Sequence, residues 1–388
     1  MTKTTSDTAT TGTKEPDTTW DISDSVFNHV DQIMELYVGV SITLVGILGN
    51  VCSLVVISSM DLRKSYNVLL LLVALSGTLY LCSTLNVLRM LCRLRNTPSI
   101  AFYREFCISY DELRSYAFYG TWVGIDMVRN IFTFSNFLLP NMIVVERIVA
   151  IFCPLKVRMY FTATRTWLAY SGIVLLYTAW SVVYYVDIYE IISITFGNRG
   201  NPVTVYAITQ YPAHPALEAI DHHVVNHLTG IIPIGVVSVG TVVLALKLVR
   251  VIRKRQTMTM SFKQPPSATI NTTTSGNNMA APEADNNSNS RKLPRLSTQV
   301  SLNLLSFCVA FILLASIGYA FGLLMTHVDI GYNLRTLLTQ CKMTVEMLYC
   351  SSNFFIHFMT NHDFVARLKR VRVTWVGRCR RVARREES

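Results

Sequence analysis

The residues with the clearest chemical potential are ionisable side chains inside long apolar stretches. Asp126 and Arg129 are three residues apart, and Lys342 and Glu346 are four apart, so each pair shares one face of a helix. A charge at the centre of a spanning helix costs about 2.5–3.5 kcal/mol on insertion scales, so these groups should face a bundle interior or a wet cavity. We expect Arg129 to approach Glu346, with Asp126 near Lys342, as the floor of a ligand pocket. The alternative is a salt-bridge cluster that only holds helices together.

Catalytic and metal-binding chemistry has no comparable signal. His222 and His223 have no paired Cys or Ser nucleophile motif, and the chain contains no Gly-x-Ser-x-Gly, His-Glu-x-x-His or phosphate-binding glycine loop. Its nine cysteines include no Cys-x-x-Cys and no His/Cys ligand spacing. We therefore expect no enzyme activity, no metal site and no cofactor.

The elements that must position these residues are apolar blocks. Of the 388 residues, 51% are hydrophobic and only 15% are charged, against roughly a quarter charged in a soluble domain. Blocks of about 20 apolar residues are long enough to cross a bilayer, and in lipid they must be helices to pair their own backbone. We predict an all-α membrane protein, a seven-transmembrane helix bundle. Its blocks are Met34–Met60, Tyr66–Leu91, Ala117–Phe152, Thr166–Val186, Val224–Val251, Val300–Met325 and Leu337–Phe358.

The distribution of Lys and Arg predicts how the chain is threaded through the membrane. Basic residues follow blocks one, three, five and seven, which places those connections in the cytoplasm and the amino terminus outside. Arginines between blocks two and three disagree with this assignment in part. The predicted domains are an extracellular polar segment (1–35), a seven-helix domain in the plasma membrane (36–372) and a basic cytoplasmic tail (373–388). A polar loop at about 256–297 is predicted to be disordered and cytoplasmic.

Two connecting regions have structure of their own. Two β-branched runs, 191–196 and 203–209, flank a Gly- and Asn-rich turn, which predicts a hairpin on the outer face; an irregular sticky loop is the alternative. After the last block, apolar residues recur at helical spacing among Arg and Lys from Phe364 to Val371, which predicts an amphipathic helix on the membrane surface. The basic tail favours membrane lipids over a nucleic-acid partner. Cys379 is either palmitoylated or an unmodified thiol.

The order of short motifs along the blocks resembles that of the rhodopsin-like (class A) G-protein-coupled receptors. The closest similarity is to invertebrate neuropeptide receptors of the FMRFamide-receptor type, and it covers roughly Leu36 to Arg372. The motifs are Gly49-Asn50 in block one, Asn67 to Leu75 in block two, Glu146-Arg147-Ile148 and Cys153-Pro154-Leu155 at the end of block three, Pro233 in block five, and Ser351 to His357 in block seven. The resemblance implies an extracellular peptide ligand, a heterotrimeric G protein and arrestin as partners.

The resemblance also implies roles for individual residues. Glu146 and Arg147 would form the coupling switch, with Arg147 meeting the G protein, and Asn353 and His357 would belong to the switch of the seventh helix. Arg129 lies about where amine receptors carry an acid, which argues against amine ligands and favours a peptide or an acidic group.

The chain departs from the family in several places. Gly77 replaces an Asp of the second helix that helps to bind sodium, and Trp122 replaces a Cys at the top of the third helix. The hairpin region contains no Cys, so both halves of the family disulfide are missing. Cys92 and Cys107 remain and are a candidate local disulfide. Block six lacks the Cys-Trp-x-Pro motif.

Three functions therefore stay open. The first is a neuropeptide receptor that couples to a G protein. The second is a chemosensory receptor for environmental compounds, in which motif loss is common. The third is a non-coupling seven-helix scaffold or decoy, which the missing disulfide and the altered block six favour. A transporter is disfavoured because the helical pattern contains no internal repeat.

Overall fold

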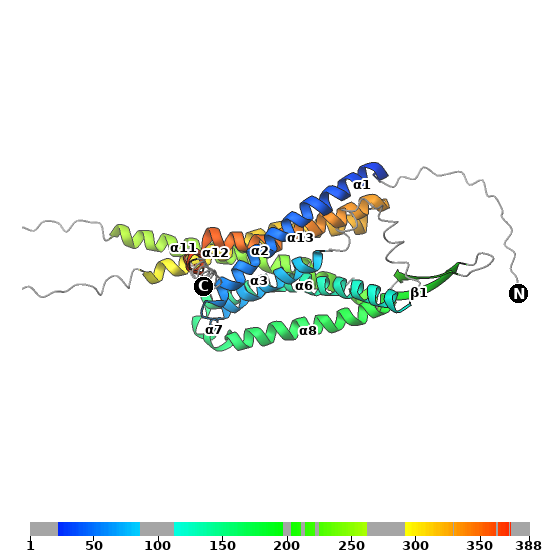
Figure 1. Cartoon of the computed structure of the whole chain (residues 1–388). Coiled ribbons are helices and arrows are strands. Elements are labelled where there is room, and N and C mark those ends of the chain that lie inside the picture. The colour runs from blue at the N-terminus through cyan, green and yellow to red at the C-terminus, as the bar shows by residue number, and fades with distance from the viewer. Residues whose placement is uncertain are drawn as a thin grey trace, which may run out of the picture.

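The computed structural model describes residues 22–85, 112–196, 203–210, 214–221, 225–261, 292–328, 330–361, 364–371 and 373. These residues form an elongated bundle of long helices (Figure 1). A two-stranded hairpin lies at one end, the hairpin end, and the short helix α7 (Pro154–Tyr160) lies at the other, the α7 end. We use these two names for the ends below.

Six helical segments of the described residues are long and apolar enough to cross a membrane. They are Asp24–Ser58, Ser65–Thr84, Val123–Phe152, Ala163–Ile188, His227–Arg250 and Asn303–His327. Helix α13 (Tyr332–Thr360) is also long enough, but it carries Lys342 and Glu346 and is not among the six. The helices indicate a membrane-embedded, multi-pass protein.

The first span is one continuous helix made of three parts: α1 (Asp24–Gln32), the π-helical segment η1 (Ile33–Gly39) and α2 (Val40–Ser58). It packs on α3 (Ser65–Thr84) and α13. The longest helix is α6 (Glu112–Phe152), which contacts α3, α8 (Ala163–Ile188) and α11 (Ile231–Ser261). Helix α12 (Lys292–His327) packs along α11 and α13. The main core joins buried side chains of α3, α6, α11, α12 and α13, among them Leu72, Ile143, Val237, Phe311 and Cys350.

Most helices coincide with the predicted blocks, but α3 ends at Thr84, before the predicted Leu91, and several others extend beyond their blocks. Helix α1 begins at Asp24, ten residues before the predicted start, because its polar residues pack on α13: Asp31 is buried and accepts a hydrogen bond from Gln340. Helices α11 and α12 enter both ends of the predicted loop, since α11 ends at Ser261 and α12 begins at Lys292. Both reach past the rest of the bundle at the α7 end (Figure 1). Residues 262–291 lie outside the described residues.

The predicted hairpin is confirmed. Strands β1 (Tyr189–Phe196) and β2 (Val203–Gln210) are antiparallel, with Ile194 opposite Val205. The short helices α9 (Pro215–Ile220) and α10 (Asn226–Thr229) then lead into α11.

The predicted amphipathic helix is also present, at 364–371. Its buried residue Phe364 packs with Val56, Ile57 and Leu70 at the α7 end, and Arg367 donates a hydrogen bond to the Ser59 carbonyl at 2.9 Å. The helix therefore closes the end of α2, while its basic residues Lys369 and Arg370 are exposed.

Pro140 lies inside α6, and the helix continues through it. A proline has no N–H, so the carbonyl of Asn136, four residues earlier, loses its helical donor. The Tyr349 hydroxyl of α13 donates to that carbonyl at 3.5 Å. In a membrane, such help from a neighbouring helix is what makes an internal proline tolerable.

This arrangement gives a stability prediction. Tyr349→Phe is expected to lower the stability of the purified protein by about 1 kcal/mol, since it leaves the buried Asn136 carbonyl without a donor. In a Pro140→Ala background the restored N–H supplies the donor, so the same substitution should cost much less. Thermal unfolding of the four proteins of this double-mutant cycle measures the coupling, and equal losses in both backgrounds would contradict it.

Candidate functional site

The predicted pocket residues of α6 form an ion pair with each other. Asp126 Oδ1 binds the Arg129 guanidinium one turn along the helix, and Asp126 Oδ2 accepts a hydrogen bond from the Tyr185 hydroxyl of α8 at 2.8 Å. Tyr189, at the start of β1, lies within the field of this pair. Burial raises the pKa of Tyr189, and the Asp126 carboxylate raises it further, while Arg129 acts in the opposite sense. The pair thus links α6 to α8 close to the start of the hairpin.

The expected approach of Arg129 to Glu346 does not produce an ion pair. In the described part of the chain, no ion pair joins Arg129 to Glu346 or Asp126 to Lys342. Glu346 instead accepts a hydrogen bond from the Tyr80 hydroxyl of α3 at 2.9 Å. The reason is local: residues three apart on a helix are already neighbours, so Arg129 reaches Asp126 without crossing the bundle. Lys342 is half-buried and makes no ion pair with a described residue.

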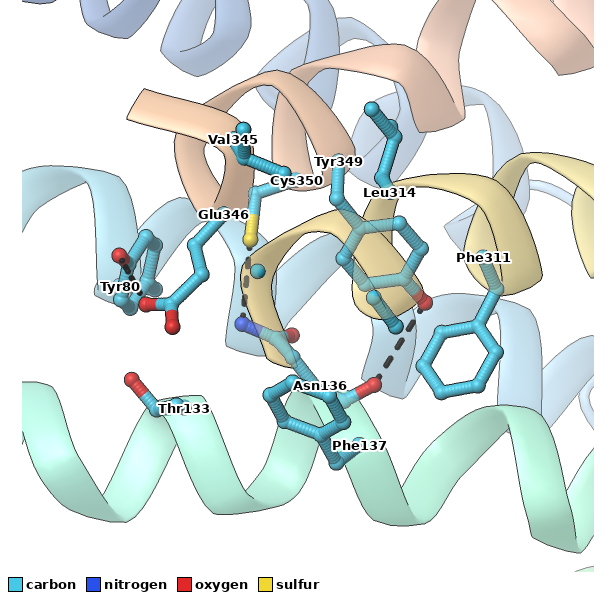
Figure 2. Close-up of a pocket in the computed structure, with 12 residues that line it drawn as sticks. Tyr80, Thr133, Asn136, Phe137, Phe311, Leu314, Val345, Glu346, Tyr349 and Cys350 are labelled. Atoms are coloured by element: carbon cyan, nitrogen blue, oxygen red, sulfur yellow. Dashed lines mark hydrogen bonds between the residues drawn. The ribbon is translucent and has the colours of Figure 1, made fainter. Parts of the chain in front are cut away.

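A small pocket lies beside Glu346, between α3, α6, α12 and α13. The space open to the centre of a water molecule is about 20 Å³, enough for about one water. Figure 2 shows the Glu346 carboxylate next to Tyr80 and Thr133 on one side, and the rings of Phe137, Phe311 and Tyr349 on the other. The floor is polar at one point, where Asn136 donates to Cys350 Sγ at 3.2 Å. The site therefore combines a carboxylate with aromatic walls.

A second polar site lies at the α7 end of the bundle. Glu146 is buried at 5% exposure, and its Oε2 lies 3.2 Å from Arg147 Nε. The Arg147 guanidinium also lies over the Tyr66 ring of α3, 3.9 Å from the ring centre, in cation–π contact. The Glu146 carboxylate and the face of the Tyr66 ring thus hold the Arg147 guanidinium against the bundle.

Asn303 of α12 connects this site to α13. Its side chain is 1% exposed, and its Nδ2 lies 3.1 Å from His357 Nδ1 and 3.4 Å from the Tyr66 hydroxyl, to which it donates. The Thr360 hydroxyl donates to Asn303 Oδ1 at 2.6 Å. One amide therefore ties α12 to α3 and to the end of α13.

Asn353, the remaining predicted switch residue, lies one turn away from this network. It donates to the Cys350 carbonyl at 3.3 Å, and Asn50 of α2 donates to the same carbonyl at 3.0 Å. A Cβ atom on Gly77 would lie 3.1 Å from Asn50 Nδ2, so the absence of a side chain at Gly77 leaves room for this pair of amides. The structure thus brings Arg147 to Glu146 and His357 to Asn303, but keeps Asn353 apart from both.

Two further predictions cannot be compared with the structure. Cys92, Cys107 and Cys379 lie outside the described residues, so the local disulfide and the lipidation stay predictions. Among the described residues, no group of three His, Cys, Asp or Glu side chains is placed to hold a metal ion.

Sequence reasoning missed the neutral partners of the charged groups. Tyr80, Tyr185, Tyr66 and Asn303 each hold one of the predicted residues in place. Each is a polar residue within a mostly apolar helix, and that pattern is a usable signal. It does not reveal which charge each residue serves, because that depends on how the helices are rotated.

Compared with known proteins, the chain matches no family model and no curated sequence. Its function is therefore inferred from its own residues and their geometry.

Proposed function

We propose that the chain is a seven-helix receptor of the rhodopsin-like G-protein-coupled type, in the plasma membrane with its amino terminus outside. Its ligand is a neuropeptide that binds at the hairpin end, and its partner at the α7 end is a heterotrimeric G protein, with arrestin as a second partner. Basic residues that follow the first, third, fifth and seventh blocks support this orientation.

The observation that carries the proposal is the set of contacts that holds the Arg147 side chain in the bundle. A guanidinium at the foot of a spanning helix is held by Glu146 at 3.2 Å and by the Tyr66 ring at 3.9 Å. Tyr66 is in turn bonded to Asn303 of α12. A movement of α12 would therefore loosen the contacts of Arg147 and free a charged group for a partner at this end. A contact that a helix movement can break is the kind of element that a ligand-driven switch requires.

Helix α13 would be the seventh spanning helix. Three of its polar groups face the bundle: Asn353 and His357 are buried, and Glu346 accepts a hydrogen bond from Tyr80 of α3. A span whose ionisable residues face the interior is allowed energetically, although its average hydropathy falls below that of the other six.

The α7 end also offers a partner surface. Leu155 of α7 is 81% exposed and Met159 is 64% exposed, next to the end of α6 that carries Arg147. Exposed apolar side chains close to the Arg147 guanidinium suit a protein partner. The basic residues of the helix at 364–371 suit anionic membrane lipids.

A screen in cells tests the proposal. Cells carrying the receptor with an amino-terminal epitope tag are exposed to a neuropeptide library, and G-protein activation and arrestin recruitment are read separately. A peptide that activates a G protein is expected, and Arg147→Ala should reduce that response by roughly tenfold or more while staining of the tag on intact cells is unchanged. A tenfold loss corresponds to about 1.4 kcal/mol of binding free energy, which is what the loss of one charged contact to the G protein would remove.

Arg63→Ala is the matched control, since Arg63 is exposed at the same end and bonds only locally, through its backbone, to Asp61. The control should signal as the wild type does. A wild-type response in Arg147→Ala would contradict the role of Arg147. A peptide that recruits arrestin without any G protein would favour the scaffold, and a response confined to environmental compounds would favour the chemosensory receptor.

A further inference from the structure

Glu346 bears a carboxylate that no cation of the described residues balances, and we propose that the pocket beside it binds a primary ammonium group of the ligand. This inference rests on the receptor function proposed above, because it names the chemistry that the same pocket recognises. It reverses the expectation that Arg129 selects an acidic ligand.

The charges near the pocket are balanced unequally. Arg129 is paired with Asp126, which the Tyr185 hydroxyl also contacts. Glu346 has a neutral partner instead, the Tyr80 hydroxyl at 2.9 Å. A ligand anion would have to compete with Asp126 for Arg129, whereas a ligand cation meets a carboxylate that has no ion pair.

Lys342 is the internal cation that could compete for Glu346. It precedes Glu346 by four residues on α13, but no nitrogen–oxygen distance of 4.0 Å or less joins the two side chains, both of which are described. The order is also the weaker one, because a pair with the basic residue on the amino-terminal side gains least from the helix dipole. Glu346 therefore keeps the Tyr80 hydroxyl as its partner and is one of the residues that line the pocket.

The pocket walls favour a cation over an anion. Phe137, Phe311 and Tyr349 line one side, and aromatic faces carry negative partial charge that attracts cations. Among the described lining residues, Glu346 is the only one with a formal charge. Figure 2 shows the Glu346 carboxylate on one side of Asn136 and the three rings on the other, so an ammonium group in the pocket is attracted by the carboxylate and by the rings.

The size of the pocket selects the kind of cation. Its water-accessible space of about 20 Å³ holds about one water molecule. A primary ammonium group is close to water in size, and its three donors suit the Glu346 carboxylate and the Thr133 hydroxyl. A planar guanidinium is wider and would need the walls to move. The ammonium can come from a small free amine or from the amino group of a peptide.

Thermal unfolding of the purified full-length protein in nanodiscs tests the inference without any G protein. The probes are phenethylammonium and its neutral isostere 2-phenylethanol, phenylalaninamide and its uncharged match N-acetyl-phenylalaninamide, and sodium chloride at equal ionic strength. The ammonium probes are expected to raise the melting temperature, with apparent affinities roughly tenfold or more above those of the neutral probes, as for a desolvated charge pair. Stabilisation by phenylalaninamide indicates a peptide amino group, and stabilisation by phenethylammonium alone indicates a small amine; either supports the proposal.

Glu346→Gln should abolish the preference for the charged probes. Asp187→Asn is the control and should keep that preference. Asp187 is an exposed carboxylate at the hairpin end that accepts a hydrogen bond from the His214 backbone N–H at 2.7 Å. If Glu346→Gln does not fold, the comparison of charged with neutral probes on the wild type still decides. Equal stabilisation by the neutral probes, or by sodium chloride alone, would overturn the proposal. If the ammonium probes do not bind selectively, the result of the G-protein experiment is not affected. If the probes bind but no G protein is activated, only the proposed receptor function is refuted.

Discussion

Replacing Asn303 with alanine is expected to raise ligand-independent G-protein activation strongly and to lower the melting temperature of the receptor. The side chain is 1% exposed and contacts His357, Thr360 and Tyr66 at 3.1, 2.6 and 3.4 Å. These contacts join α12 to α13 and to α3, and alanine removes all of them. The activity is measured as nucleotide exchange or G-protein dissociation in cells without ligand, and the stability by thermal unfolding.

The size of the effect follows from the hydrogen bonds. Each contributes about 0.5–1.5 kcal/mol net, so the three together contribute about 2 kcal/mol to the state in which α12 is held. If all three hydrogen bonds are lost on activation, removing them by mutation shifts the equilibrium between the inactive and active receptor by up to roughly 30-fold. The Tyr66 ring, freed from Asn303, also holds Arg147 less firmly.

A matched substitution separates this switch from a general loss of stability. Asn141→Ala removes an amide of α6 that donates only to its own helix, at the Phe137 carbonyl, and should leave basal activation unchanged. Asn303→Ala and His357→Ala should be less than additive, because both break the same contact. A lowered melting temperature with basal activation at the wild-type level would make Asn303 a structural link only.

Hydropathy predicted the positions of the helices because a spanning segment must be apolar and must pair its own backbone. It did not predict the ends of the helices, since α1 and α12 continue into polar sequence, where hydropathy no longer indicates a helix. The hairpin was readable from its β-branched runs and turn residues. Pro140 lies within a predicted helix, but Tyr349, whose hydroxyl donates to the carbonyl that the proline leaves unpaired, is more than two hundred residues away and cannot be found from local sequence.

The candidate site was predictable as a set of residues and not as a set of contacts. The cost of charge in lipid identified Asp126, Arg129 and Glu346 as interior groups, and in the structure all three side chains are partly buried. Their pairing depends on the rotation of each helix and on rotamers, which sequence spacing does not fix. Spacing did give the one pair that lies within a single helix, Asp126 with Arg129; the expected contacts across the bundle were wrong.

Gly46 is expected to tolerate no side chain, and Gly46→Leu should abolish folding and surface expression. A Cβ atom at this position would lie 2.7 Å from Leu81 Cδ1 of α3 and 2.9 Å from Ser351 Cβ of α13, distances at which something must move. Small residues let membrane helices approach closely. Even Gly46→Ala should therefore lower stability, by about 1–3 kcal/mol as for other overpacked sites, as measured by thermal unfolding.

The matched control is Gly172→Ala on α8, where a Cβ atom would meet nothing within 4 Å. Because alanine is the better helix former, that control should be neutral or slightly stabilising, so a loss confined to Gly46 isolates the steric term. The double substitution Gly46→Ala with Ser351→Gly removes the side chain in conflict and should recover part of the loss, although Ser351 Oγ no longer bonds the Ile42 and Met347 carbonyls, at 3.2 and 2.7 Å. Two results together would contradict this explanation: no recovery of stability in the double variant, and equal losses of stability in Gly46→Ala and Gly172→Ala. Glycine at position 46 would then not be required by the close packing of α2, α3 and α13.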